Sequence, residues 1–194
     1  MVALAADGSG WSALAPMAQA RWGAAAALLP DGKILVVGGL STGHHDSALK
    51  SAELYDPATN AWTALPDMAD ERAGAAASVL SSRQVAVMGG CGVGGETWKE
   101  CEAFDPAKRT WEPLPEMAEA GRPVVDRRRV RGRGVAPVPG GMVVMGREAA
   151  ELFDEEIGRW VTLPHPMGQP RVRGAQLVSL PASALQATAG EAGE

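Results

Sequence analysis

One stretch of this chain occurs three times, and this repetition limits the folds that are open to it. The copies cover residues 51–68, 99–117 and 149–167, and each carries a glutamate, an aromatic residue, an aspartate, a tryptophan, a Leu-Pro pair and a methionine in the same order. A partial copy opens the chain, so that Trp11, Trp62, Trp111 and Trp160 recur after 51, 49 and 49 residues. An internal period near 50 residues indicates a repeat architecture in which each copy is one supersecondary unit.

The segments between these copies predict a β-hairpin in every repeat. In the first, Pro30-Asp31-Gly32 separates an Ala/Leu run from the apolar run of residues 34–37, and turn residues between β-forming runs are typical of a hairpin. Each repeated stretch contains a second hairpin. In the first copy, the turn of this hairpin runs from Asp56-Pro57 to Asn60. One repeat is therefore predicted to be four short antiparallel strands, here called strands a to d.

These repeats resemble those of kelch β-propellers. The resemblance covers residues 9–180; Arg147 departs from it, because it stands where the third repeat should have its second glycine. The residues that carry it are the diglycines Gly38-Gly39 and Gly89-Gly90, the aromatics Tyr55, Phe104 and Phe153, and the tryptophans Trp62, Trp111 and Trp160. The resemblance implies an all-β propeller segment of four-stranded antiparallel blades.

The predicted strands do not add up to a whole ring. Residues 1–8 are expected to be an N-terminal extension and residues 181–194 a disordered tail. The propeller segment then has blades at residues 21–66, 72–115 and 129–164, with partial strands at 9–16 and 173–180. Because closed propellers have at least four blades, we expect an incomplete ring. Further blades of a longer propeller, an open arc, or self-association with another chain are the alternatives.

The repeated carboxylates and tryptophans are interpreted as structural. Glu53, Glu102 and Glu151 occupy one register position and could be taken for catalytic acids. A feature that recurs with the fold is better explained by the fold, and we expect these glutamates to pair with repeated arginines such as Arg21, Arg72 and Arg171. The four periodic tryptophans are expected to be core residues between neighbouring blades.

The irregular residues converge on one face of the predicted propeller, called the loop face here. It is formed by the b–c loops, residues 40–50 and 91–100, and by the d–a connections, of which the third has an insertion within residues 118–128. Binding residues are usually carried on loops of a rigid scaffold. The candidate partner-binding residues on this face are Trp22, His44, His45, Trp98, Arg127, Arg128 and Arg131.

Each candidate has a plainer alternative. Trp22 and Trp98 are the tryptophans outside the period, and Trp98 could instead pack beneath its own loop. The two histidines are better explained as solvated loop residues than as metal ligands, so no metal or cofactor is expected. The arginines lie among five in the seven residues 127–133, and could be a solvated loop or a site for an acidic or phosphorylated peptide.

Composition narrows the class of protein further. The formal net charge of −5 argues against a general nucleic-acid-binding role. The chain has neither a run of about 18 apolar residues nor a secretory leader pattern, so we expect a soluble chain without membrane contact, in the cytoplasm or alternatively the nucleus. In that setting Cys91 and Cys101, at the two roots of one loop, are expected to be reduced.

Three functions fit these observations. The first is a noncatalytic kelch-repeat module for protein–protein interaction, such as the substrate-recognition part of a larger scaffold or ubiquitin-ligase adaptor. The second is an enzyme, because kelch-type rings include sugar oxidases and mutarotases. Galactose-oxidase-like chemistry needs two tyrosines, whereas this chain has one, Tyr55, which belongs to the repeat. The third is a purely structural blade segment.

Overall fold

The structure is a computed structural model, and it describes residues 2–4, 8–42, 44–118, 124–126, 129–131, 134–145 and 150–163. Side chains are described at these positions except in 2–4, 45, 124–126 and 129–131. Within this part of the chain, no helix is long and apolar enough to span a membrane.

The described residues contain three four-stranded antiparallel sheets, which are the three predicted blades. Each sheet has its strands in the order a, b, c, d, so every neighbouring pair in space is also consecutive in sequence. Blade one is β3 (Ala25–Leu28), β4 (Ile34–Val37), β5 (Ala52–Asp56) and β6 (Ala61–Leu65); blade two is β7 (Ala76–Val79), β8 (Val85–Met88), β9 (Cys101–Asp105) and β10 (Thr110–Leu114); blade three is β13 (Val135–Val138), β14 (Gly141–Met145), β15 (Ala150–Asp154) and β16 (Arg159–Thr162). The all-β fold of four-stranded antiparallel blades predicted from the sequence is confirmed.

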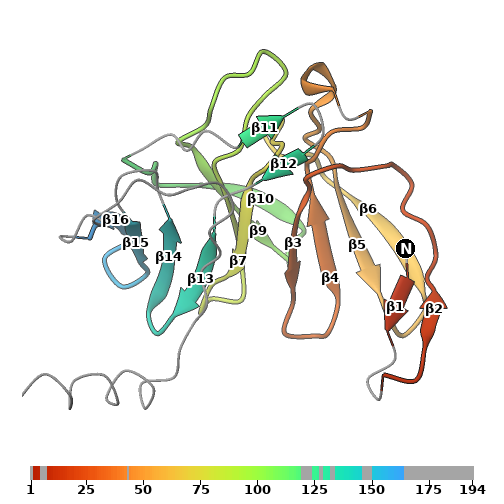
Figure 1. Cartoon of the computed structure of the whole chain (residues 1–194). Helices are drawn as coiled ribbons and strands as arrows, with labels where there is room; N and C mark the ends of the chain where they lie inside the picture. Colours follow the sequence, from red (N-terminus) through yellow and green to blue (C-terminus); the bar gives the residue numbers. More distant parts are fainter. Residues whose placement is uncertain are drawn as a thin grey trace, which may run out of the picture.

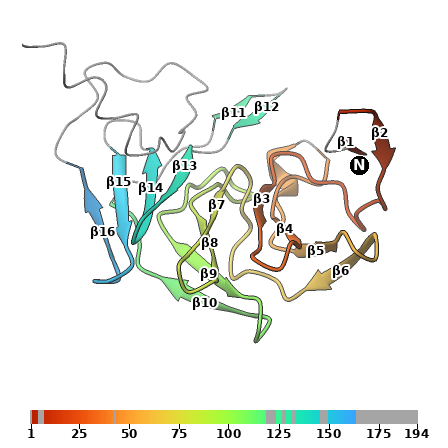
Figure 2. The same ribbon diagram turned by 90° about the horizontal axis from the view of Figure 1, so that it is seen from below.

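The three blades stand in an arc (Figures 1 and 2). Their a strands β3, β7 and β13 are innermost, and β7 lies between the other two. The d strands β6, β10 and β16 form the outer rim. Alanines in the a strands allow the blades to converge. The b strands are continuously apolar because both of their faces are buried, as in β8, whose four residues VAVM are all buried.

The c–d turns show how the repeat controls its backbone. Asn60, Arg109 and Gly158 hold the same turn position and have φ of 50°, 57° and 62°. This left-handed conformation is best tolerated by glycine and asparagine, so Arg109 is the costly member of the set. The Arg109 guanidinium donates to the carbonyl of Ala64 on the rim of blade one (3.1 Å). The residue in this costly conformation therefore makes a hydrogen bond between blades one and two.

Apolar faces pack between successive blades. The interface of blades one and two includes Leu35 and Val37 from one side and Val85, Val87 and Phe104 from the other. The next interface includes Met88 and Met117, which meet Met142, Val144 and Phe153. These two clusters are the core of the described structure, and each links two neighbouring repeats.

The tryptophan of each blade links that blade to the preceding repeat. Each ring lies against the aromatic residue opposite it on strand c, with centroids 5.0 Å apart for Tyr55 and Trp62, 5.1 Å for Phe104 and Trp111, and 5.2 Å for Phe153 and Trp160. Each indole also donates to a carbonyl of the preceding repeat, at Ala15, Pro66 and Pro115 respectively, over 2.8 to 2.9 Å. These three rings are half-buried between repeats.

Trp11 corrects this part of the prediction. It was expected in the core, but 68% of its surface is exposed. The reason is an unpredicted strand, β1 (Val2–Leu4), which pairs with β2 (Trp11–Ala13) and places Leu4 opposite Trp11. The residue opposite each of the other tryptophans is aromatic, so Trp11 lacks the ring that covers its counterparts.

Two smaller elements lie on the loop face. The b–c loop of blade one contains the 3₁₀ turn η1 (His45–Ser47). The long third d–a connection contains a short hairpin, β11 (Val124–Asp126) and β12 (Arg129–Arg131). The predicted strand at residues 173–180 and the predicted tail at 181–194 lie outside the described residues.

Candidate interaction surface

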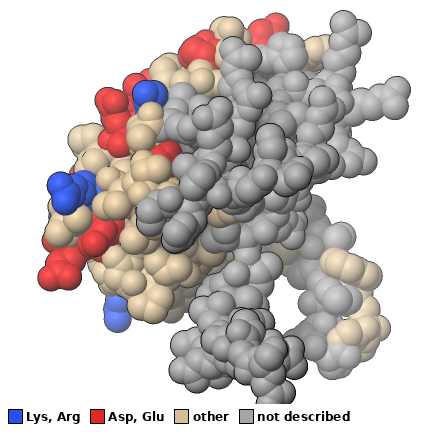
Figure 3. All heavy atoms as spheres, turned by 60° about the vertical axis from the view of Figure 1, so that its left-hand side comes forward, with Lys and Arg blue, Asp and Glu red and all other residues tan. Residues whose placement is uncertain are grey.

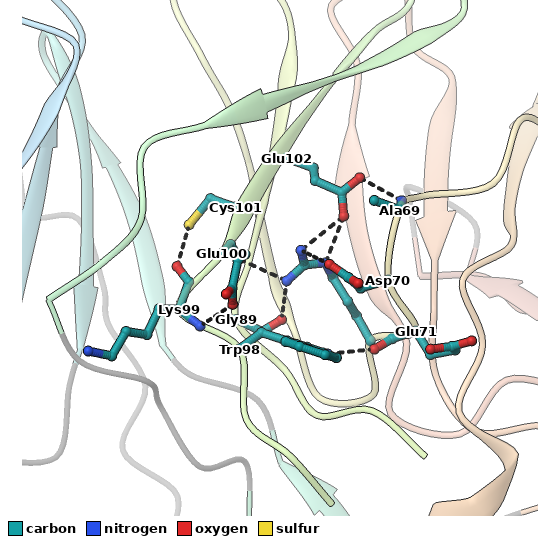
Figure 4. Close-up of polar contacts among 10 residues, drawn as sticks. Ala69, Asp70, Glu71, Gly89, Trp98, Lys99, Glu100, Cys101 and Glu102 are labelled. Carbon is teal, nitrogen blue, oxygen red and sulfur yellow. Dashed lines mark hydrogen bonds and ion pairs between the residues drawn. The ribbon is translucent and has the colours of Figure 1, made fainter. Parts of the chain in front are cut away.

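Two buried Arg–Glu pairs hold the d–a connections in place. Arg72 is fully buried and donates to Glu102 Oε1 from both Nε and Nη2, over 3.0 and 2.9 Å (Figure 4). Its Nη1 donates to the carbonyls of Gly89 and Glu100, at 3.0 and 2.8 Å. Arg21 repeats the arrangement with Glu53, Gly38 and Ser51 in blade one.

The second oxygen of each repeated glutamate is also used. Glu53, Glu102 and Glu151 accept from the backbone N–H of Ala18, Ala69 and Ala118, at 2.8, 2.8 and 2.6 Å. The predicted pairing of Glu53 and Glu102 with Arg21 and Arg72 is confirmed, while Arg171 lies outside the described residues. In both Glu53 and Glu102 one oxygen is therefore engaged by an arginine and the other by a backbone N–H, which favours a structural role over acid–base chemistry.

The diglycines let the d–a connection approach strand b closely. Gly38 and Gly39 have φ of 63° and 91°, and a Cβ on Gly38 would collide with the carbonyl of Arg72. That carbonyl accepts the N–H of Gly39 at 2.9 Å, so the diglycine of blade one is joined to the connection that leads into blade two. The d–a connection is therefore anchored to strand b of blade one at this point.

Trp22 is a strongly exposed tryptophan on the loop face. It forms a bridge with Leu40, as Ala73 does with Cys91 in the next repeat, so Trp22 and Ala73 hold equivalent positions. Ala73 is fully buried, whereas 62% of the surface of Trp22 is exposed. Trp22 is thus a large, solvent-exposed apolar residue at a position where the next repeat has a small, buried alanine.

Trp98 lies differently. Its ring is half-buried, and Nε1 donates to the carbonyl of Glu71 over 2.8 Å (Figure 4). This bond ties the b–c loop of blade two to the adjacent d–a connection. Trp98 is therefore less exposed than Trp22, and its role in partner binding stays a prediction.

The remaining predicted residues are placed as follows. His44 is exposed before η1, and His45 lies within η1, where only its backbone is described. Arg131 is the last residue of β12, again as backbone, and Arg127 and Arg128 lie outside the described residues. Within the described part of the chain, no group of three or more His, Cys, Asp or Glu side chains could hold a metal ion.

Cys91 and Cys101 are both buried free cysteines. Cys91 packs with Leu40, Ala48 and Ala73 beneath the loops, whereas Cys101 belongs to the interface of blades two and three. Burial raises the pKa of the Cys91 thiol, and the nearby Glu96 carboxylate adds to this effect.

The sequence analysis missed Val93. It lies in the b–c loop of blade two and 43% of its surface is exposed. The sequence signal was available, because Val93 is a large apolar residue flanked by Gly92 and Gly94 in a loop. Together, Val93 and Trp22 give the loop face exposed apolar side chains on two different blades.

The described part of the loop face is acidic around blade two. Side chains of Asp70, Glu71, Glu96 and Glu100 are at least partly exposed there, with Lys99 among them. More acidic than basic side chains are also visible on the side of the molecule shown in Figure 3. The described side chains therefore give this part of the loop face a negative charge.

Comparison with known proteins identifies the repeats. Residues 21–69, which span blade one and the residues after it, match the family model described as Kelch motif. A stretch of 86 residues is 38% identical to Kelch-like protein 33 of Homo sapiens and covers 44% of this chain. Blade one therefore contains a kelch motif, and the resemblance to kelch repeats seen in the sequence is confirmed.

The kelch fold is also shared with a solved structure, that of YjhT. The two are 19% identical with a TM-score of 0.68, and the match covers 87% of this kelch chain and 59% of the YjhT chain. The matched stretch is 15% of the length of the human relative, so this chain corresponds to a small part of that protein.

Proposed function

We propose that this kelch segment is a noncatalytic module for protein–protein interaction and that its loop face receives the partner. The observation that carries the proposal is Trp22, 62% exposed at the position where the next repeat buries Ala73. Exposed tryptophans are frequent anchors at protein interfaces, since a large ring can be fully desolvated by a partner. The kelch relationship supports an interaction role in general.

The anchor rests on a rigid base. The bridge between Trp22 and Leu40 is made by two backbone hydrogen bonds of 2.9 and 2.8 Å, and the adjacent Arg21 is held by Glu53. A side chain whose backbone is fixed in this way loses less freedom on binding than one on a loose loop. Val93 and His44 extend the surface onto the two b–c loops.

The partner proposed here is a protein with an acidic or phosphorylated segment near its contact with Arg127, Arg128 and Arg131. Arginine pairs bidentately with carboxylate and phosphate, so a cluster can hold an anion although the chain is negative overall. Because Asp70, Glu71, Glu96 and Glu100 would repel the same anion, the arginines must determine where it lies.

A capture experiment tests the face, with Trp11 as a matched control. Trp11 is as exposed as Trp22 but lies on β2, away from the b–c loops. Any partner captured by the parent chain should bind the Trp22→Ala variant at least about tenfold more weakly. This corresponds to a loss of about 1.4 kcal/mol or more in binding free energy. Trp11→Ala should bind like the parent. If only the Trp11 variant loses binding, the loop face is not the binding face.

The charge preference needs a separate experiment. Arg127→Glu/Arg128→Glu should weaken binding of the captured partner, and the difference from the parent should shrink as salt shortens the Debye length from about 10 Å at 0.1 M to about 3 Å at 1 M. Arg83→Glu, an exposed arginine in the a–b turn of blade two, is the control on the opposite face. Equal weakening by both variants would show a general charge effect rather than a site.

A further inference from the structure

The hairpin of β1 and β2 has the register of the outer half of a blade. In each complete blade, the aromatic residue of strand c lies opposite the tryptophan of strand d, as Tyr55 lies opposite Trp62. Leu4 lies opposite Trp11 with the same separation of seven residues along the chain. By this register β1 corresponds to strand c, β2 corresponds to strand d, and Val2 stands where blade one has Glu53.

The residues after β2 also contact blade one as a preceding blade would. Trp62 Nε1 donates to the Ala15 carbonyl over 2.9 Å, as Trp111 Nε1 donates to the Pro66 carbonyl over 2.8 Å. The N–H of Ala18 reaches Glu53 as the N–H of Ala69 reaches Glu102. The outer half of a blade is therefore in place beside blade one.

The inner half of that neighbouring blade is not present among the described residues. Leu28 pairs with Ile34 as Val79 pairs with Val85, so Leu28 and Val79 are equivalent. Val79 packs into the interface with blade one, but 65% of the surface of Leu28 is exposed. Among the described residues, β1 pairs with β2 alone, so the other edge of β1 has no strand beside it.

The two complete interfaces show what such a face accepts. In the contact of blades one and two, the inner strands contribute the small residues Ala25 and Ala27 from strand a and the aliphatic residues Leu35 and Val37 from strand b. In the next contact Ala76, Ala86 and Met88 take these places. The fitting occupant is thus an a–b hairpin with small residues in one strand and aliphatic residues in the other.

The chain itself offers no free hairpin of this kind among its described residues. Its three a–b hairpins each belong to a complete blade. The sequence after Pro181 has no run comparable to residues 34–37, since it reads ASALQATAGEAGE. We propose that β1 and the exposed face around Leu28 receive a kelch-type a–b hairpin from a polypeptide segment outside residues 1–194, which adds to the edge of β1 by strand pairing.

The register of β1 and β2 shows where an added hairpin should be fused to test this proposal. Because residue 1 corresponds to Ala52 of blade one, a second copy of residues 24–51 fused directly before Met1 supplies strands a and b and their loop at the spacing of the repeat. The fusion should slow amide hydrogen exchange of residues 2–4 roughly tenfold or more, because edge amides gain partners. The matched control carries Leu35→Asp and Val37→Asp in the added copy only, and it should give no slowing.

Three outcomes would overturn the proposal. Equal exchange at residues 2–4 in the fusion and its control would show that the edge takes up no hairpin. If removing residues 164–194 from the native chain speeds exchange at residues 2–4 and leaves β7 unchanged, the chain covers the edge itself. If the native chain is a dimer that the fusion converts to a monomer, a second copy is the occupant. Exchange of β7 reports folding in every variant.

Discussion

The buried pair of Arg72 and Glu102 allows a quantitative prediction. Replacing Arg72 by methionine keeps much of the side-chain volume but removes every donor. Glu102 would keep only the N–H of Ala69, and the carbonyls of Gly89 and Glu100 would lose the donor they now share. The change therefore leaves one buried carboxylate without its counter-charge and two carbonyls without their side-chain donor.

The magnitude follows from burial. The side chains of Arg72 and Glu102 are 0% and 7% exposed, so solvent can screen neither charge. Breaking a buried pair by removing one partner costs about 3 to 5 kcal/mol. We expect Arg72→Met to lower the free energy of unfolding by about 4 kcal/mol. Arg72→Lys should lose about half as much, because an ammonium group keeps the charge but lacks the planar fork that makes two bonds to Glu102 and one to each carbonyl.

Urea denaturation measures these losses. With a slope of about 2 kcal/mol per molar, the Arg72→Met midpoint should fall by roughly 2 M. The double variant Arg72→Met/Glu102→Leu should be more stable than Arg72→Met alone, because the orphaned carboxylate is gone. Lys50→Met, which breaks the exposed 4.0 Å pair with Asp67, should change stability by less than about 0.5 kcal/mol. Losses of Arg72→Met and Glu102→Leu that simply add in the double variant would refute this account.

Three further predictions concern other repeated residues. Trp111→Ala should cost about 3 kcal/mol by calorimetry, since it removes a half-buried ring and its bond to Pro66, whereas the exposed Trp11→Ala should cost under about 0.5 kcal/mol; similar losses would contradict the register of β1. Gly38→Ala should destabilise the chain more than Gly32→Ala, because both have positive φ but only Gly38 faces a backbone carbonyl, and equal melting temperatures would count against this. The raised pKa of Cys91 means that less thiolate is present than in an unfolded thiol at the same pH, so at pH 8 alkylation of native Cys91 should be slower than in urea; equal rates would show that the loop does not bury it.

Sequence alone predicted most of what recurs with the period, with Trp11 as the exception. The four strands of each blade, the diglycines and the two Arg–Glu pairs could be inferred because three copies of one pattern show which positions belong to the fold. Strand β1 could not, since three residues of sequence Val-Ala-Leu carry no turn signal before them and no aromatic residue opposite Trp11. The exposure of Trp11 was missed for the same reason.

The candidate surface was predicted less completely. Departure from the repeat correctly singled out Trp22 as different from its counterpart, Ala73, but the same rule could not tell that Trp98 bonds to Glu71. That bond depends on how two loops of different connections meet, which no local pattern encodes. The same rule also singled out Arg127 and Arg128, and their role stays a prediction because they lie outside the described residues.

The tryptophan bonds have a consequence for how the chain folds. Each bond of Trp111 and Trp160 joins residues 45 apart in sequence, which is about one repeat. Contacts at this separation require a loop of the same length to close first, so each interface should form slowly relative to the hairpins within a blade. Because every such contact joins only adjacent repeats, blades should dock one after another along the chain, as in a one-dimensional array. During synthesis, about 45 further residues must therefore be added after the end of a blade before the tryptophan that bonds to it is available.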